Sequence, residues 1–150
     1  MQFQQILRND AEKVFVVVTN VGAAITKGMG VCYVINNASI TTGNRVIPSD
    51  ADGNATDQIG FIGIAAADIA VDAVGRVQCF GYVDSVLVSH VGSSITITMG
   101  DPMIPGRLAG GMFTGAPTIL NGGLKYVIVG NLTPATISAA TYVNGFIRAL

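Results

Sequence analysis

Few side chains in this sequence have the types that catalysis requires. His90 is the only histidine among the 150 residues, so a histidine-dependent nucleophile would have to use it. Ser89 is its one adjacent hydroxyl, and on a strand it is too close in sequence to act as the nucleophile partner of His90. No recognisable triad context surrounds the pair. We therefore expect His90 to be a structural or surface residue, and we expect the protein not to be an enzyme.

A polar stretch, "SDADGNATD", carries oxygen ligands at a spacing similar to that of a calcium loop. These ligands are Asp50, Asp52, Asn54 and Asp57. Calcium loops of this kind end on an acidic ligand at the twelfth position, which here is Phe61. Metal binding is the lesser alternative, and we expect a polar excursion of turn-forming residues without a metal.

The remaining candidate residues are two cysteines and a pair of glycines. Cys32 and Cys79 are too few and too far apart for a disulfide framework or a four-ligand zinc site. Each lies in an apolar, strand-like run, which predicts a buried thiol without a role in function. The glycines of "GMGVCYVIN" lack a phosphate-loop lysine and a following helix, so no nucleotide or other cofactor is expected.

The composition is unusually poor in charge. Charged residues make up 11% of the chain, against about 25% in ordinary soluble domains, and 50% of the residues are hydrophobic. Eight basic and nine acidic residues, without a basic cluster, argue against a nucleic-acid partner. No apolar run reaches the length of a membrane span, and no signal-peptide core is present, which predicts synthesis in the cytoplasm. Protein partners are therefore the expected cover for the apolar surface.

Short β-branched and aromatic runs, separated by Gly, Asn, Pro and Asp, predict an all-β fold. Runs 13–19 and 31–35 predict two neighbouring strands, and residues 145–150 predict a closing strand. In 93–99 an alternating pattern places Ile95, Ile97 and Met99 on one face. An Asn-Gly pair at 121–122 predicts a hairpin turn.

Two segments have weak helix signals, 65–70 and 133–142, and we expect loops or single turns there. The number of short strands favours a small antiparallel β-barrel or β-sandwich over residues 13–150 as a single domain. Residues 1–12 precede the first strand and combine neutral glutamines with apolar side chains at Phe3, Ile6 and Leu7. We expect an extended N-terminal arm that becomes ordered on a partner, with a frayed terminus as the alternative.

Three stretches carry a resemblance to a known family. They are "ITKGMGV" at 25–31, the run from Gly63 to Val88, and "GDPMIPG" at 100–106. With them, the sequence resembles the small β-rich head decoration, or cement, proteins of tailed bacteriophages. The polar 50–57 stretch and the glutamine-rich start are not part of that pattern. The resemblance implies a barrel-like protein, commonly trimeric, on the outside of an icosahedral shell, where it ties neighbouring capsid subunits together.

This resemblance and the composition lead to a functional expectation. The protein is expected to decorate the exterior of a virion, with the major capsid protein and its own copies, as a homotrimer, for partners. The arm residues Phe3, Ile6 and Leu7 would bind the capsid. Within 60–88, the residues expected at contacts between subunits are Phe80, Tyr82, Val86 and Val88. Three alternatives stay open: the 60–88 run as ordinary strands of a monomer, another virion component such as a head-fibre base, tail or shell subunit, and a β-barrel binding module or hydrolase.

Overall fold

A computed structural model describes residues 13–34, 44–49, 60–89, 95–105, 113–115, 126–130 and 135–149. Within these ranges the chain forms strands and no helix. The strands are β1 (Val14–Asn20), β2 (Gly30–Tyr33), β3 (Arg45–Pro48), β4 (Phe61–Ala65), β5 (Val74–Ser89), β6 (Ile95–Ile97), β7 (Pro102–Pro105), β8 (Phe113–Gly115), β9 (Tyr126–Val129), β10 (Ala135–Ile137) and β11 (Thr141–Arg148). The longest is β5, with 16 residues, and it organises the fold.

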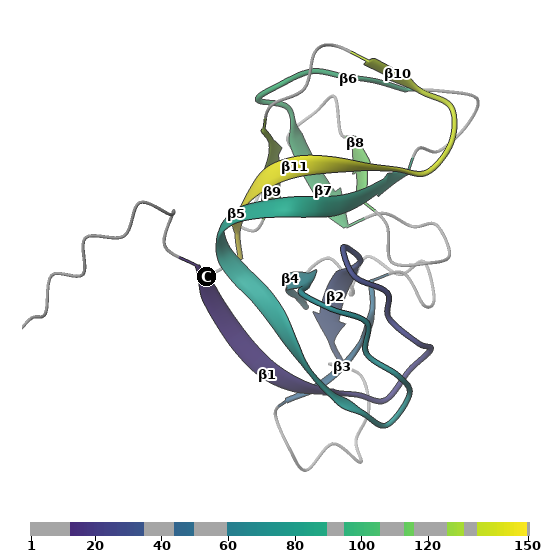
Figure 1. Cartoon of the computed structure of the whole chain (residues 1–150), viewed down its shortest axis with the longest axis vertical. Coiled ribbons are helices and arrows are strands. Elements are labelled where there is room, and N and C mark those ends of the chain that lie inside the picture. Colours follow the sequence, from purple (N-terminus) through teal and green to yellow (C-terminus); the bar gives the residue numbers. More distant parts are fainter. Residues whose placement is uncertain are drawn as a thin grey trace, which may run out of the picture.

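The first half of β5 closes a barrel of five strands. It pairs antiparallel with β1, from Val74 opposite Thr19 to Phe80 opposite Val14, and antiparallel with β4. β1 pairs in parallel with β3, β3 pairs with β2, and β2 pairs with β4. The ring is therefore closed through hydrogen-bonded neighbours on every side. This first barrel is the lower part of the molecule in Figure 1.

The second half of β5 closes another ring of five strands. It pairs antiparallel with β11, from Val88 opposite Thr141 to Phe80 opposite Arg148. β11 pairs with β9, β9 with β7, and β7 with β8, which returns in parallel to the end of β5. β6 and β10 form a separate two-stranded sheet at the top of this second barrel in Figure 1. Closed rings leave few open strand edges, so the barrels avoid edge-to-edge pairing.

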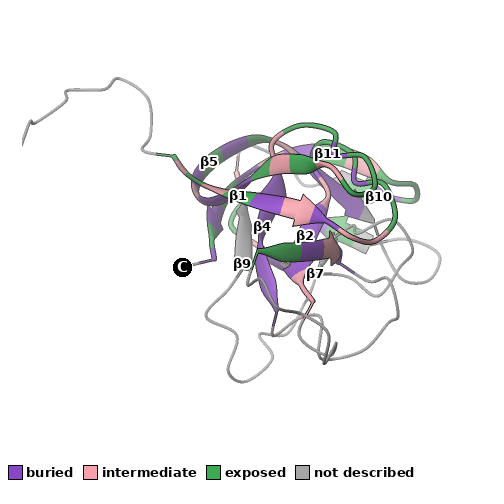
Figure 2. Ribbon diagram, turned by 90° about the horizontal axis from the view of Figure 1, so that it is seen from below, coloured by how far each residue is buried: buried purple, intermediate pink, exposed green. Residues whose placement is uncertain are grey.

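Each barrel has an apolar core, and the strands alternate between inward and outward side chains (Figure 2). The first core consists of Val18, Ile25, Val31, Val46, Ile62, Ala65, Ile69 and Val77. The second consists of Cys32, Phe61, Ile64, Cys79, Val83, Val86, Val88, Ile97, Met103, Val129, Ile137, Val143, Ile147 and Ala149. Because the second core includes residues of β2 and β4, the two cores meet where the barrels join.

A buried glutamine supports β5 where the strand passes from one barrel to the other. Gly81 has a φ of 98°, a conformation that glycine adopts without steric cost. The side-chain amide of Gln78 donates hydrogen bonds to the carbonyls of Phe80 (3.1 Å) and Tyr82 (2.8 Å) on either side of it. Gln78 is only 5% exposed, and a buried amide is tolerated because its donors are satisfied.

The all-β barrel predicted from the sequence is confirmed, and so are the strands near 13–19, 31–35 and 145–150 and the loop at 65–70. The expectation that the strands at 13–19 and 31–35 are neighbours in the sheet is wrong. β3 lies between them, because its four residues pair with β1 on one side and β2 on the other. The expected hairpin at 121–122 lies outside the described residues.

Two further expectations are corrected. Residues 133–142 are not a loop, since β10 occupies 135–137 and β11 begins at Thr141. Met99 does not share the buried face of Ile97, because β6 ends at Ile97. There Asp101 accepts a hydrogen bond from the backbone N–H of Thr98 (2.7 Å) and closes a turn that leaves Met99 exposed.

The close approach of β4 to β5 predicts that Gly63 tolerates no larger residue. A Cβ at this position would overlap the carbonyl oxygen of Gln78. We expect Gly63→Ala to lower the free energy of unfolding by about 1–3 kcal/mol more than Gly100→Ala, measured by urea denaturation. Gly100 is the control because it also has a positive φ, 92°, but has open space around it. Equal losses in the two variants would contradict the close approach.

Candidate functional site

The two cysteines lie in the core. Cys32 is in β2 and Cys79 in β5, and both are at most 1% exposed. The Cys79 thiol donates a hydrogen bond to the carbonyl of Val14 at 3.3 Å. Burial raises the pKa of Cys79 above its ordinary value, which keeps the sulfur in the unreactive thiol form. The prediction that both are buried thiols is confirmed.

Metal ligands do not converge within the described ranges, where no group of three His, Cys, Asp or Glu side chains could hold an ion. His90 and the polar 50–57 stretch lie outside the described residues, so the predictions for them stay predictions. The part of the chain that the structure describes includes no helix of the length and apolar character of a membrane span.

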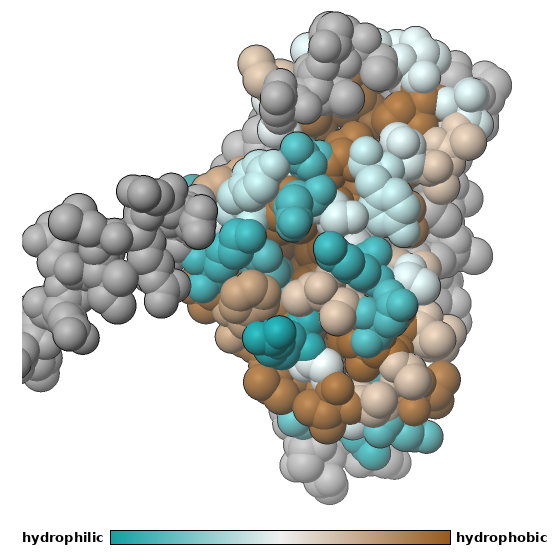
Figure 3. All heavy atoms as spheres, in the orientation of Figure 1, coloured by the Kyte–Doolittle hydropathy of each residue, from teal (hydrophilic) through white to brown (hydrophobic). Residues whose placement is uncertain are grey.

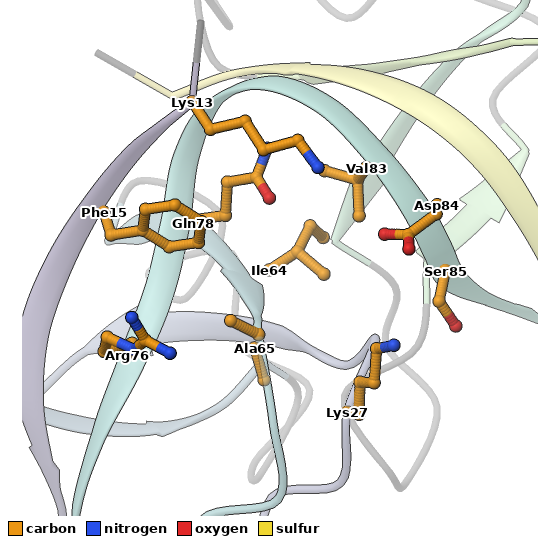
Figure 4. Close-up of a pocket in the computed structure, with 11 residues that line it drawn as sticks. Lys13, Phe15, Lys27, Ile64, Ala65, Arg76, Gln78, Val83, Asp84 and Ser85 are labelled. Carbon is orange, nitrogen blue, oxygen red and sulfur yellow. The ribbon is translucent and has the colours of Figure 1, made fainter. Parts of the chain in front are cut away.

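A cavity of about 240 Å³ lies beside the bend of β5 (Figure 4). Its apolar lining comes from Ile64, Ala65 and Ala66 at the end of β4 and from Val83 and Phe15. Its polar lining consists of Lys13, Lys27, Arg76, Gln78, Asp84 and Ser85. We call it the cationic cavity, because three of its side chains are positively charged and one is negatively charged.

Three separate segments bring the cations together. Lys13 directly precedes β1, and Arg76 lies in the first half of β5. Lys27 is placed by the turn at Gly28, whose N–H donates to Ala65 of β4 (3.0 Å) and whose carbonyl accepts from Leu87 of β5 (2.9 Å). The N–H of Lys27 itself is bound by Asp68 Oδ1 at 2.7 Å. These bonds hold the turn against both barrels and fix one wall of the cavity.

Aromatic side chains are exposed next to this cavity, on the outward side of β1, β5 and β11. This aromatic face comprises Phe15, Phe80, Tyr82, Tyr142 and Phe146; all except the half-buried Phe80 are 37–56% exposed. Tyr82 is directly opposite Phe146 in the sheet, and the rings of Phe80 and Phe146 meet edge to face at 5.3 Å. Figure 3 shows one side of the molecule, with hydrophilic residues in the middle of the view and hydrophobic ones mainly at the bottom and the upper right.

Two cations of the cavity also contact aromatic rings of this face. The Lys13 ammonium is 5.8 Å from the centre of the Tyr82 ring, and the Arg76 guanidinium is 5.7 Å from that of Phe15. Such cation–π contacts hold the charges beside the rings instead of leaving them free in solvent. The cationic cavity and the aromatic face are therefore one continuous surface.

The structure divides the residues that were predicted to contact other subunits. Phe80 and Tyr82 point outward, so their role stays a prediction. Val86 and Val88 are fully buried, which corrects the expectation for these two. The cause is a bulge: Val83 and Val86 of β5 pair with Gly145 and Val143 of β11, so two residues of β5 face one of β11.

The extra residue at this bulge shifts the alternation by one, and the following even-numbered side chains turn inward. The simple alternation of inward and outward side chains therefore fails after residue 84.

The arm residues that were predicted to bind the capsid, Phe3, Ile6 and Leu7, lie outside the described residues. The sequence analysis did not identify Lys13, Lys27 and Arg76, because they come from distant segments and form no motif. No family model matches the chain, and no curated protein matches it.

Burial of both thiols predicts slow chemical modification. A thiol reagent such as dithionitrobenzoate should react with the native protein at the rate of unfolding, and rapidly only in denaturant. The raised pKa of Cys79 also predicts that stability falls as the pH rises above the unfolded thiol's pKa, since the unfolded state then loses a proton that the folded state keeps. Rapid labelling of the native protein at neutral pH would contradict this.

Proposed function

We propose that this protein is a capsid decoration protein, which binds the outside of an icosahedral bacteriophage head and stabilises contacts between major capsid subunits. In this role it acts as a homotrimer and not as an enzyme. It would stabilise the shell by burying interface area. A closed barrel from a charge-poor chain is suited to this, because little polar surface has to be desolvated on binding.

The observation that carries the proposal is the aromatic face. Large exposed apolar patches mark interaction sites in soluble proteins, and Phe and Tyr are enriched in interfaces. Here the exposed rings of Phe15, Tyr82 and Phe146 lie on adjacent strands of a rigid sheet. A rigid surface of this kind loses little conformational entropy on binding.

The position of the chain start supports the same assignment. Lys13, the first described residue, lies beside the ring of Tyr82 on the aromatic face. Residue 13 therefore lies next to this face, and an arm formed by the residues before it would start from the side that carries the rings. Three arms of one trimer would bind with high effective concentration after the first has docked.

The proposal predicts that the arm and the face contribute separately to binding. Deletion of residues 1–10 should leave the barrels folded and the protein trimeric but sharply reduce its binding to purified shells that lack it. Burial of each large apolar arm residue contributes about 1.5–3 kcal/mol, less ordering costs of roughly 1–2 kcal/mol per residue, so the effect depends on several arms together. Shell occupancy is measured by titration and sedimentation.

A double variant of the face, Tyr82→Ser with Phe146→Ser, should weaken self-association or shell binding. Met99→Ser is the control, because Met99 is 63% exposed but is not part of the aromatic face. Light scattering reports the mass of each variant, and circular dichroism reports its folding. A wild-type protein that stays monomeric at all concentrations and adds no mass to shells would overturn the proposed function.

A further inference from the structure

We propose that the cationic cavity binds the carboxylate of an acidic side chain, glutamate or aspartate, that a partner polypeptide inserts into it. The partner is then held by apolar contact on the aromatic face and by charge in the cavity. The charge and size of the cavity carry this inference. It rests on the proposed function in one respect only, that the partner is a shell subunit or another copy of this protein.

Charge is the first argument. Three cations and one carboxylate, Asp84, line the cavity, which gives a formal net charge of 3 − 1 = +2. The whole chain has only eight basic residues, so three of them gather at this one place. Within the described ranges no salt bridge pairs Lys13, Lys27 or Arg76 with an acidic group. This net positive charge would attract an anion that enters the cavity.

Size is the second argument. Sites for drug-sized small molecules have volumes of about 300–1,000 Å³. The cationic cavity, at about 240 Å³, lies below that range and is suited to one side chain. Its floor of Ile64, Ala65 and Val83 offers apolar contact for the methylene groups of such a side chain.

The acceptors in the cavity favour a carboxylate on a polypeptide over free phosphate. Asp84 and the side-chain oxygen of Gln78 both face the cavity (Figure 4). They disfavour a doubly charged phosphate more than a singly charged carboxylate, and the backbone N–H of a peptide could donate to either of them. Arg76 supplies a planar set of donors that matches a carboxylate, and its stacking on Phe15 holds it at the edge of the cavity.

The test uses the full-length protein labelled with nitrogen-15 and the capped peptide acetyl-Ala-Glu-Ala-amide as the probe. The matched peptide with Gln in place of Glu is the first control, and inorganic phosphate is the second probe. We expect the Glu peptide to shift the amide resonances of Arg76, Gln78 and Ser85 in a saturable manner. The Gln peptide should bind roughly tenfold more weakly, and added salt should weaken the Glu peptide.

Charge-removing variants locate the site. Lys27→Gln with Arg76→Gln should weaken the Glu peptide roughly three- to tenfold. Arg45→Gln, which removes an exposed cation outside the cavity, should leave the affinity unchanged. The proposal is overturned if Glu and Gln peptides bind alike, if the shifts lie away from the cavity, or if phosphate binds more tightly than the Glu peptide.

The outcome separates the site from the function. If the Glu peptide binds in the cavity and the protein does not add to shells, the site stands and the capsid role fails. If the protein adds to shells and the peptide does not bind, the capsid role stands and this inference fails. Shell binding by the Lys27→Gln, Arg76→Gln variant then shows whether the cavity contributes to that contact.

Discussion

The fold depends on one strand that belongs to two barrels. β5 has a contour length of roughly 50 Å, and it is paired along both halves. Its inward side chains must fill the first core at Val77 and the second at Val83 and Val86. A straight strand with strict alternation does not meet both demands. Gly81 and the bulge opposite Asn144 provide the bend and the change of face that do.

The surface follows from the same geometry. Where β5 bends, β1, β4 and the turn at Gly28 surround a hollow, and four charged side chains line it. Phe80 and Tyr82 flank the bend at Gly81, and their side chains are on the outward side of the sheet. Cavity and aromatic face together form a surface with both apolar and charged contacts for a protein partner. This surface supports the proposed role in binding.

The sequence predicts those features that depend on local pattern. Runs of β-branched residues identify β1 and β2, and the apolar, strand-like runs around Cys32 and Cys79 identify their buried thiols. Pairing between distant segments is different, since β3 is only four residues long and nothing local places it between β1 and β2. The inward turn of Val86 depends on a bulge that the partner strand sets. The cavity was not predictable for the same reason, because closure of the first barrel brings its cations together.

Hydrogen exchange of the native protein tests most directly whether β5 couples the two barrels. If the shared strand makes them one cooperative unit, the slowest amides of β4 and β5 in the first barrel and of β5 and β11 in the second should exchange with the same free energy. That value should equal the global free energy of unfolding. Exchange of the β11 amides through an opening of clearly lower free energy, while the first barrel stays protected, would contradict the account.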